Sequence, residues 1–389
     1  MATRADFFSI DFMMESTPGV DPGIVAAPYV TVTDVTEGKY VPNLTNADKA
    51  FALLAAAPEG LPELKTVEIP EMRVVRDYGS KRLRGLKNEG EITLTFNAHG
   101  WSRAPGTDRP APPPWLQLAA SGCGHLYGNV AAVDTGGVAT PLATVAPDVL
   151  TAGCTVLDGH VIAVKDVNAT TPTVHCARPS NATAQTVTAY QIAPGFTTEA
   201  DDEVWPTCQT HFDYRNDAIG PVGGSNAPVT YTILVNQADI NAAQMFFGCR
   251  ANKIEIEGKV GAVVSVKITF IYDWWSTYTE GGANWTGYAV KTAKPKYGTT
   301  CYDLIWPDPE VLQRANLVWI DTADSNARKA PHIAGFKWGW EAGYTRFNAE
   351  TGVEGVGGIF ATGAQRVSMS RSEERRVGKE CRSRWSPYH

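Results

Sequence analysis

The chain has 389 residues, 43% of them hydrophobic, and its 34 basic and 41 acidic side chains give a net charge of −7. The apolar content suffices for real cores, and the length allows two or three ordinary domains, or one domain with a large insertion. No apolar run reaches the ~18 residues that a membrane-spanning helix needs. Met1–Gly19 carries acids where a signal peptide needs an apolar stretch. An acidic chain is not expected to bind nucleic acid as a ligand, because Lys and Arg that neutralise phosphate supply most of that affinity.

Glycine, proline, threonine, valine and aromatic residues dominate, which predicts a mainly β protein with short flanking helices. The first helix is expected at Asn46–Ala57, which is Ala-rich and opens on a capping asparagine. A second is expected at Pro114–Ser121, where proline suits a first helical turn. Two further short helices are predicted at Asp239–Phe246 and Asp308–Ala315.

A long polar loop is predicted at Arg76–Gly90, before the first clear strand. Its five basic residues are Arg76, Lys81, Arg82, Arg84 and Lys87. A basic loop on an acidic body is a candidate contact with an acidic surface, including a copy of the same protein. The alternative interpretation is a solvated, mobile loop.

Alternating apolar and polar residues predict the main strands. The first is Glu91–Asn97, with Ile92, Leu94 and Phe96 on one face. Asn252–Glu257 and Val264–Tyr272 form a long antiparallel hairpin with one wet face and one buried face. Phe336, Trp338 and Trp340 mark another strand, and a further strand is expected to begin at Arg366–Met369.

The middle of the chain is predicted to be an insertion. From about Gly128 to Thr198 it contains short β runs separated by Gly, Asn and Pro, with few aromatic residues. A small inserted β module set into a loop of the main fold, a sandwich or decorating domain, is the natural interpretation.

Four stretches, taken together, resemble the tail tube proteins of long-tailed, siphovirus-like bacteriophages. They are ESTPGVDP (Glu15–Pro22), the strand-to-helix unit Gly90–Gly124, the hairpin Phe246–Trp275 after a small residue–Cys step, and the closing IFATGAQRVSMS (Ile359–Ser370). These stretches cover roughly a third of the chain, in the family's order around an insertion. Ser276–Asn326 has no counterpart in the family pattern.

The resemblance implies a tail-tube-type β-sandwich or barrel with a flanking helix, and the chain divides accordingly. Residues 1–127 and 201–370 form the two parts of the tube domain, and residues 128–200 form the inserted module outside the tube. Copies are expected to form a ring, typically hexameric, whose sheets join edge to edge. The expected ring-forming hairpin residues are Ile254, Glu255, Ile256, Glu257, Val264, Val266, Lys267 and Ile268.

The same resemblance implies a structural role without enzyme activity, cofactor or metal. Stacked rings would enclose a lumen through which DNA passes without specific binding, and other phage tail proteins are the further partners. The location implied is the virion tail, assembled in the bacterial host cytoplasm, with no membrane contact. A ring built from strand edges satisfies backbone groups that a lone sheet must otherwise protect. The basic loop Arg76–Gly90 is the candidate inter-ring contact.

The six cysteines before Arg371 are scattered without a CxxC pair and are interpreted as free thiols, although Cys154 and Cys176 flank a predicted hairpin and could pair. A zinc site at His175, Cys176, Cys208 and His211 is disfavoured, because adjacent residues on a strand point to opposite faces.

Other functions have weaker support. Asp201–Glu203 is interpreted as a solvated turn rather than a pair of glycosidase carboxylates, and Gly352–Gly358 as a linker or turn. Trp274, Trp275, Trp338 and Trp340 suit core packing better than a sugar-stacking platform. Two alternatives stay open: another virion β protein (capsid decoration, tail terminator or baseplate component), and a carbohydrate-binding or hydrolytic β protein.

The segment Arg371–His389 resembles one reading frame of a common sequencing adapter, so it is interpreted as an artefactual tail. Without its six basic and three acidic residues, the 34 and 41 of the chain become 28 and 38, a net charge of −10.

Overall fold

The computed structural model describes the backbone of residues 8–29, 49–62, 66–72, 78–84, 90–98, 102–103, 110–111, 113–127, 142–146, 149–151, 162–166, 173–183, 186–191, 203–206, 209–212, 230–240, 242–278, 283–289, 318–320, 327–329, 333–353, 356–361 and 365–373. Within these ranges the chain is mainly β, as the composition predicts. The described elements include one α-helix, α1 (Pro114–Cys123), and a 3₁₀ turn, η6 (Ala283–Trp285).

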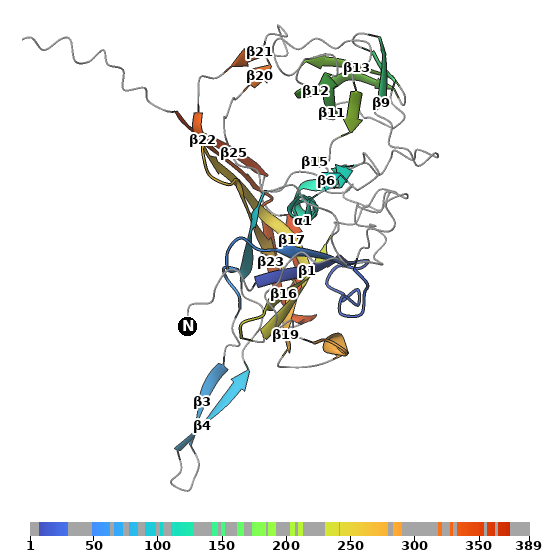
Figure 1. Cartoon of the computed structure of the whole chain (residues 1–389). Helices are drawn as coiled ribbons and strands as arrows, with labels where there is room; N and C mark the ends of the chain where they lie inside the picture. The colour runs from blue at the N-terminus through green and yellow to red at the C-terminus, as the bar shows by residue number, and fades with distance from the viewer. Residues whose placement is uncertain are drawn as a thin grey trace, which may run out of the picture.

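Nine strands form one open antiparallel sheet (Figure 1). Its strands are β1 (Phe8–Met14), β2 (Ala50–Leu53), β5 (Glu91–Asn97), β16 (Tyr231–Gln237), β17 (Ala242–Lys259), β18 (Ser265–Ile271), β19 (Trp274–Thr277), β22 (Ile333–Glu341) and β25 (Arg366–Glu373). The main order is β2-β1-β16-β17-β18-β5; β19 and β22 also pair with β17, and β25 pairs with β22.

The long strand β17 joins two halves of this sheet. Its first half pairs with β16 and β19, and its second half, from Arg250, pairs with β18 and β22. Between them Gly248 has φ +68°, and a Cβ atom there would lie 2.0 Å from Asp273 Oδ2. Only glycine fits this corner without strain, because it has no Cβ and tolerates positive φ.

The main core lies against the inner faces of both halves. Ile10 and Phe12 of β1 are buried there with Leu94 of β5, Ile268 of β18 and Trp340 of β22. Leu118 of α1 belongs to the same core. A second cluster around Met245, Phe247 and Trp285 covers the other face of the first half, so β1 is buried along its whole length. The second half, in contrast, keeps one face in water.

The remaining strands form smaller units. A closed barrel consists of β9 (Leu142–Ala146), β10 (Val149–Thr151), β11 (Ile162–Asp166), β12 (Thr173–Thr183), β13 (Thr186–Gln191) and β14 (Glu203–Pro206). Two-stranded ribbons pair β3 (Thr66–Met72) with β4 (Tyr78–Arg84), β6 (Ser102–Arg103) with β7 (Pro110–Ala111), β8 (Gly124–Tyr127) with β15 (Gln209–Phe212), β20 (Val318–Ile320) with β21 (Ala327–Lys329), and β23 (Tyr344–Val353) with β24 (Val356–Ala361). The barrel falls largely within the predicted module 128–200, with β14 beyond its end.

Most of the strand predictions are confirmed. Glu91–Asn97 forms β5, the long hairpin forms the end of β17 with β18, and Phe336–Trp340 lies within β22. The helix predicted at Pro114–Ser121 is α1. The strand expected from Arg366 is β25, which continues into the first three residues of the adapter-like segment.

Two helix predictions are wrong. Within Asn46–Ala57, Ala50–Leu53 is strand β2, paired with β1 and buried, because pairing and burial in the sheet override the high helix propensity of alanine. Within Asp239–Phe246, a turn leads into β17, whose apolar residues fill the cores on both faces. A continuous apolar run shows neither the alternation of a half-buried strand nor the period of an amphipathic helix, so its pattern cannot distinguish the two. The helix predicted at Asp308–Ala315 lies outside the described residues.

None of the helices in the described part of the chain is long and apolar enough to cross a bilayer.

Candidate assembly surface

The second half of the sheet presents a continuous polar surface, here called the polar face. It follows from strict alternation in β5, β18, β17, β22 and β25, whose other residues point to the core. Directly opposed residues line up in rows across the strands. The rows are Thr93-Thr269-Lys253-Glu341-Arg366, Thr95-Lys267-Glu255-Gly339-Ser368 and Asn97-Ser265-Glu257-Lys337-Ser370.

Lysines of the polar face are matched to carboxylates. Lys337 Nζ lies 2.9 Å from Glu255 Oε1, and Lys253 Nζ lies 3.4 Å from the same oxygen. The hydrogen bond from Lys337 holds the pKa of Glu255 below its usual range. Lys267 pairs with Glu59 at 2.9 Å. Each lysine of this surface therefore has an acidic partner, on the sheet itself for Lys253 and Lys337 and on residue Glu59 for Lys267.

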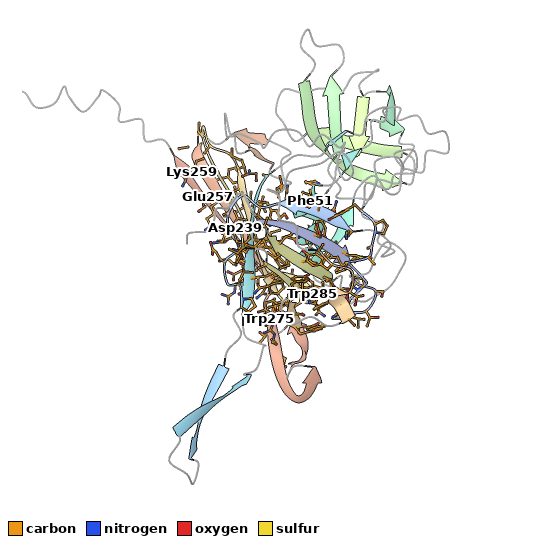
Figure 2. The ribbon with its side chains drawn as sticks, turned by 60° about the horizontal axis from the view of Figure 1, so that its bottom comes forward. Phe51, Asp239, Glu257, Lys259, Trp275 and Trp285 are labelled. Atoms are coloured by element: carbon orange, nitrogen blue, oxygen red, sulfur yellow. The ribbon has the colours of Figure 1, made fainter. Side chains whose placement is uncertain are left out.

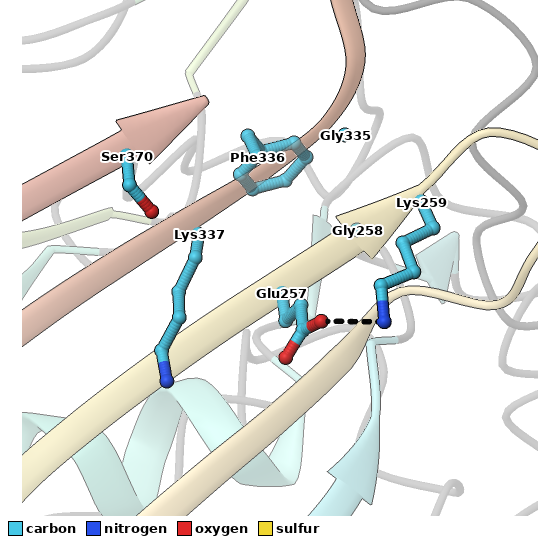
Figure 3. Close-up of a pocket in the computed structure, with 7 residues that line it drawn as sticks. All are labelled: Glu257, Gly258, Lys259, Gly335, Phe336, Lys337 and Ser370. Atoms are coloured by element: carbon cyan, nitrogen blue, oxygen red, sulfur yellow. Dashed lines mark ion pairs between the residues drawn. The ribbon is translucent and has the colours of Figure 1, made fainter. Parts of the chain in front are cut away.

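The polar face ends in an open hollow at the far end of β17 (Figure 3). Lys259 Nζ lies 3.0 Å from Glu257 Oε1 beside it, and Phe336 and Ser370 complete the lining. Glu257 and Lys259 lie at the opposite end of the sheet from Trp275 (Figure 2). The described side chains include no group of three or more metal-binding residues.

One border of this half-sheet is a bare strand. Among the described strands β25 pairs only with β22, and residues 366–370 are exposed. Val367 is 58% exposed and Met369 53% exposed. Val367 lies opposite Trp340 and Met369 lies opposite Trp338. Both side chains therefore lie on the core side of the sheet, beyond the residues that the core covers. An exposed edge with an apolar side is a template for pairing with another strand.

The opposite border is covered. The outer edge of β5 carries residues Ala55–Gly60, here called the edge strap. Thr93 exchanges two backbone hydrogen bonds with Glu59, and the Ala55 amide donates to the Thr95 carbonyl at 2.8 Å. The half-sheet thus has one capped edge and one bare edge.

The predicted ring-forming hairpin lies inside the sheet rather than at its border. Ile254, Val264, Val266 and Ile268 are buried in the core, and Ile256 packs against it. Both strands have hydrogen-bonded neighbours on both sides, β18 and β22 for β17, and β17 and β5 for β18. Of the hairpin residues, Glu255, Glu257 and Lys267 lie on the polar face. The bare edge belongs to β25, two strands away.

The predicted basic loop is partly a strand. Tyr78–Arg84 forms β4, which pairs with β3 in a ribbon that extends from the sheet on the side away from the barrel (Figure 1). In its register Lys81 faces Ile69, Arg82 faces Glu68 and Arg84 faces Thr66. Arg76 and Lys87 lie outside the described residues. The many charged residues of Tyr78–Arg84 do not show the apolar–polar alternation of a strand, so the sequence pattern did not predict β4.

A buried carboxylate that the sequence pattern did not single out joins two of the tail-tube-like stretches. Glu15 Oε2 accepts hydrogen bonds from the Gly19 amide (2.8 Å) and the Thr230 hydroxyl (2.7 Å). Its Oε1 accepts from the Thr232 hydroxyl (2.7 Å) and the Gly248 amide (2.8 Å). Burial raises the pKa of Glu15, and these four bonds oppose the rise. Glu15 thereby fixes the N-terminal turn to the corner of β17.

The other candidate residues do not form a site within the described residues. His175 and Cys176 lie in β12 of the barrel, and His211 lies in β15 of a separate ribbon, while Cys208 is outside the described part. Trp275 and Trp340 are buried in the core, and Trp274 stacks on Phe247 with ring centroids 3.8 Å apart. These tryptophans pack, as predicted, rather than form a platform. Gly352–Gly358 spans the ends of β23 and β24, which pair as a hairpin. Glu203, the one described residue of the acidic run, lies in β14.

A comparison with known proteins gives no match to a protein-family model and none to a curated sequence.

Proposed function

We propose that this chain is a structural subunit of a bacteriophage tail tube, which forms stacked rings around a DNA-conducting lumen in the virion. The observation that carries the proposal is the bare edge of β25. Within the described residues, β25 has a paired strand on one side only and exposes Val367 and Met369. Such an edge is a liability in a monomer, and a neighbouring copy removes that liability by adding a strand.

The polar face suits the lining of such a lumen. It is about five strands wide, wet, and free of apolar side chains along its rows. Because Lys253, Lys259 and Lys337 are paired with carboxylates of the sheet itself, the face offers phosphate few cations that are not already neutralised, and DNA can pass without being held.

The contact between Glu15 and Gly248 gives the resemblance a physical basis. The Glu-x-Thr-x-Gly segment and the residue that precedes Cys249 are more than two hundred positions apart, and one carboxylate joins them. A need, shared with tail tube proteins, to hold this corner in place accounts for the presence of both stretches in one chain. Other tail proteins are the proposed further partners, with assembly in the host cytoplasm.

Electron microscopy of the purified full chain tests the function. We expect rings or hollow tubes with a central channel. Discrete monomers or trimers at all concentrations would favour another virion role, such as a capsid decoration. Specific retention on a glycan resin would favour a carbohydrate-binding protein.

A further inference from the structure

The edge strap occupies the position that a neighbouring strand would take. It reaches the outer edge of β5 through three backbone hydrogen bonds, two to Thr93 and one to Thr95. Leu54, directly before the strap, is buried, and Ala57 within it packs against the core. The strap thus supplies β5 with both backbone partners and apolar cover, as a paired strand does.

The strap does so over a short length. Only Glu59 and Thr93 form a bridge, whereas β18 pairs with all seven residues of β5 on the other side. The ion pair from Glu59 to Lys267 lies at the surface, where such pairs contribute little. A full strand from another chain would use more of the edge than the strap does.

Strand β25 has the pattern that this edge requires. Along β5, Ile92 and Leu94 point to the core and Glu91 points to the polar face. Along β25, Val367 and Met369 lie on the core side and Arg366 on the polar side. Joining the two strands therefore continues the apolar face and the polar face of the sheet from one copy into the next.

We propose that β5 is the acceptor edge for β25 of a second copy, and that the edge strap is a built-in cap which must leave before the two copies can pair. The inference rests on the proposed ring assembly and adds its interface and its control. A capped acceptor also explains how a chain with a bare edge remains unpaired until assembly, since the complementary border is occupied in each free subunit.

A reversible lock tests the cap. Glu59 and Thr93 form a hydrogen-bonded antiparallel pair, for which Cα atoms lie about 5.5 Å apart, within the range of a disulfide. The double variant Glu59→Cys/Thr93→Cys fastens the strap to β5 when oxidised. We expect the oxidised protein, with the bond verified by mass spectrometry, to lose ring and tube formation, and added reductant to restore it.

A matched control places the same kind of bond in the interior of the sheet. Glu257 and Ser265 are opposed on β17 and β18, and Glu257→Cys/Ser265→Cys ties these two strands together while leaving the strap and both borders alone. The oxidised control should assemble as the wild type does.

A second variant opens the cap instead of locking it. Gly60 has φ +76°, and a Cβ atom there would lie 2.3 Å from the Glu91 carbonyl oxygen. Gly60→Ala should push the strap off β5 and shorten the lag before light scattering reports assembly. Normal assembly of the oxidised lock, or an unchanged lag in Gly60→Ala, would overturn the cap and leave the tube function standing. If the wild-type chain and the reduced lock both fail to assemble, the tube function itself is overturned and the cap with it.

Discussion

At the scale of single residues, Glu15 is the polar group on which the corner of β17 depends. Each of its oxygens receives one backbone amide and one hydroxyl. A hydroxyl can rotate to offer its oxygen, but a backbone amide can only donate. When it is ionised, Glu15 can accept from all four donors at once, which a neutral amide side chain cannot do.

The variant Glu15→Gln tests this difference. Either orientation of the amide places its NH₂ group against the amide of Gly19 or Gly248, so one buried donor loses its partner. We expect a loss of about 2 kcal/mol in the free energy of unfolding, measured in urea by the fluorescence of the buried tryptophans. Glu59→Gln, at an exposed carboxylate, is the control and should change it by less than about 0.5 kcal/mol. Equal effects of the two variants would contradict this expectation.

The same carboxyl predicts a dependence on pH. Burial raises the pKa of Glu15 above its usual value of 4.5. As pH rises from 4.5 towards the raised pKa, the unfolded chain has lost this proton while the folded chain retains it. The folded state then binds more protons, and its stability falls with rising pH. The stability advantage of the wild type over Glu15→Gln should therefore shrink as the pH rises above 4.5 and through the raised pKa of Glu15. An advantage that grows over this range would show that the folded pKa is lowered.

At the scale of elements, the decisive feature is which strands have neighbours. Strong alternation in the sequence identified the hairpin of β17 and β18, yet its strands are interior to the sheet. Strand β25, whose alternation of apolar and polar residues is weaker, lies at the border of this half of the sheet. Alternation reports which face of a strand is buried, but edge position depends on strands that arrive from distant parts of the chain.

Charge at the bare edge should block assembly without unfolding the subunit. Val367 and Met369 are more than half exposed, so Val367→Glu/Met369→Glu should leave the thermal unfolding midpoint nearly unchanged. In the tube, paired strands would bury these side chains, and two carboxylates there would prevent rings in electron micrographs. The control Val263→Glu changes an exposed valine at the turn before β18, and it should assemble. Normal tubes from the double variant would remove β25 from the interface.

At the scale of the whole molecule, the chain combines a branched sheet, whose second half ends at β5 and β25, with a barrel and a projecting ribbon (Figure 1). Strand borders lie in the plane of the sheet and suit contacts around a ring. The β3–β4 ribbon extends away from the sheet and suits contacts between rings. Under the proposed tube assembly, one subunit would thereby use separate elements for contacts around a ring and between rings.

Reversing charge on the ribbon should separate the two directions. The variant Arg82→Glu/Arg84→Glu changes two residues of β4 opposite Glu68 and Thr66. We expect folded subunits that form single rings but do not stack, because the contact between rings loses its basic partner. Sedimentation velocity and electron microscopy distinguish rings from tubes. Lys259→Glu, on the main sheet, is the control, and tubes of normal length from the double variant would exclude the ribbon from stacking.

The sequence by itself determined the mainly β character, the helix α1, and the buried faces of β5, β18 and β22, because these follow from periods of two to four residues. Only the tertiary structure decided that Ala50–Leu53 is a strand, that Glu15 reaches Gly248, and that β5 is capped while β25 is bare. Each of these depends on pairing between segments far apart in the chain. A local pattern specifies whether a residue faces the core or the solvent. Which strand pairs with its own strand is determined by the free energy of the whole sheet.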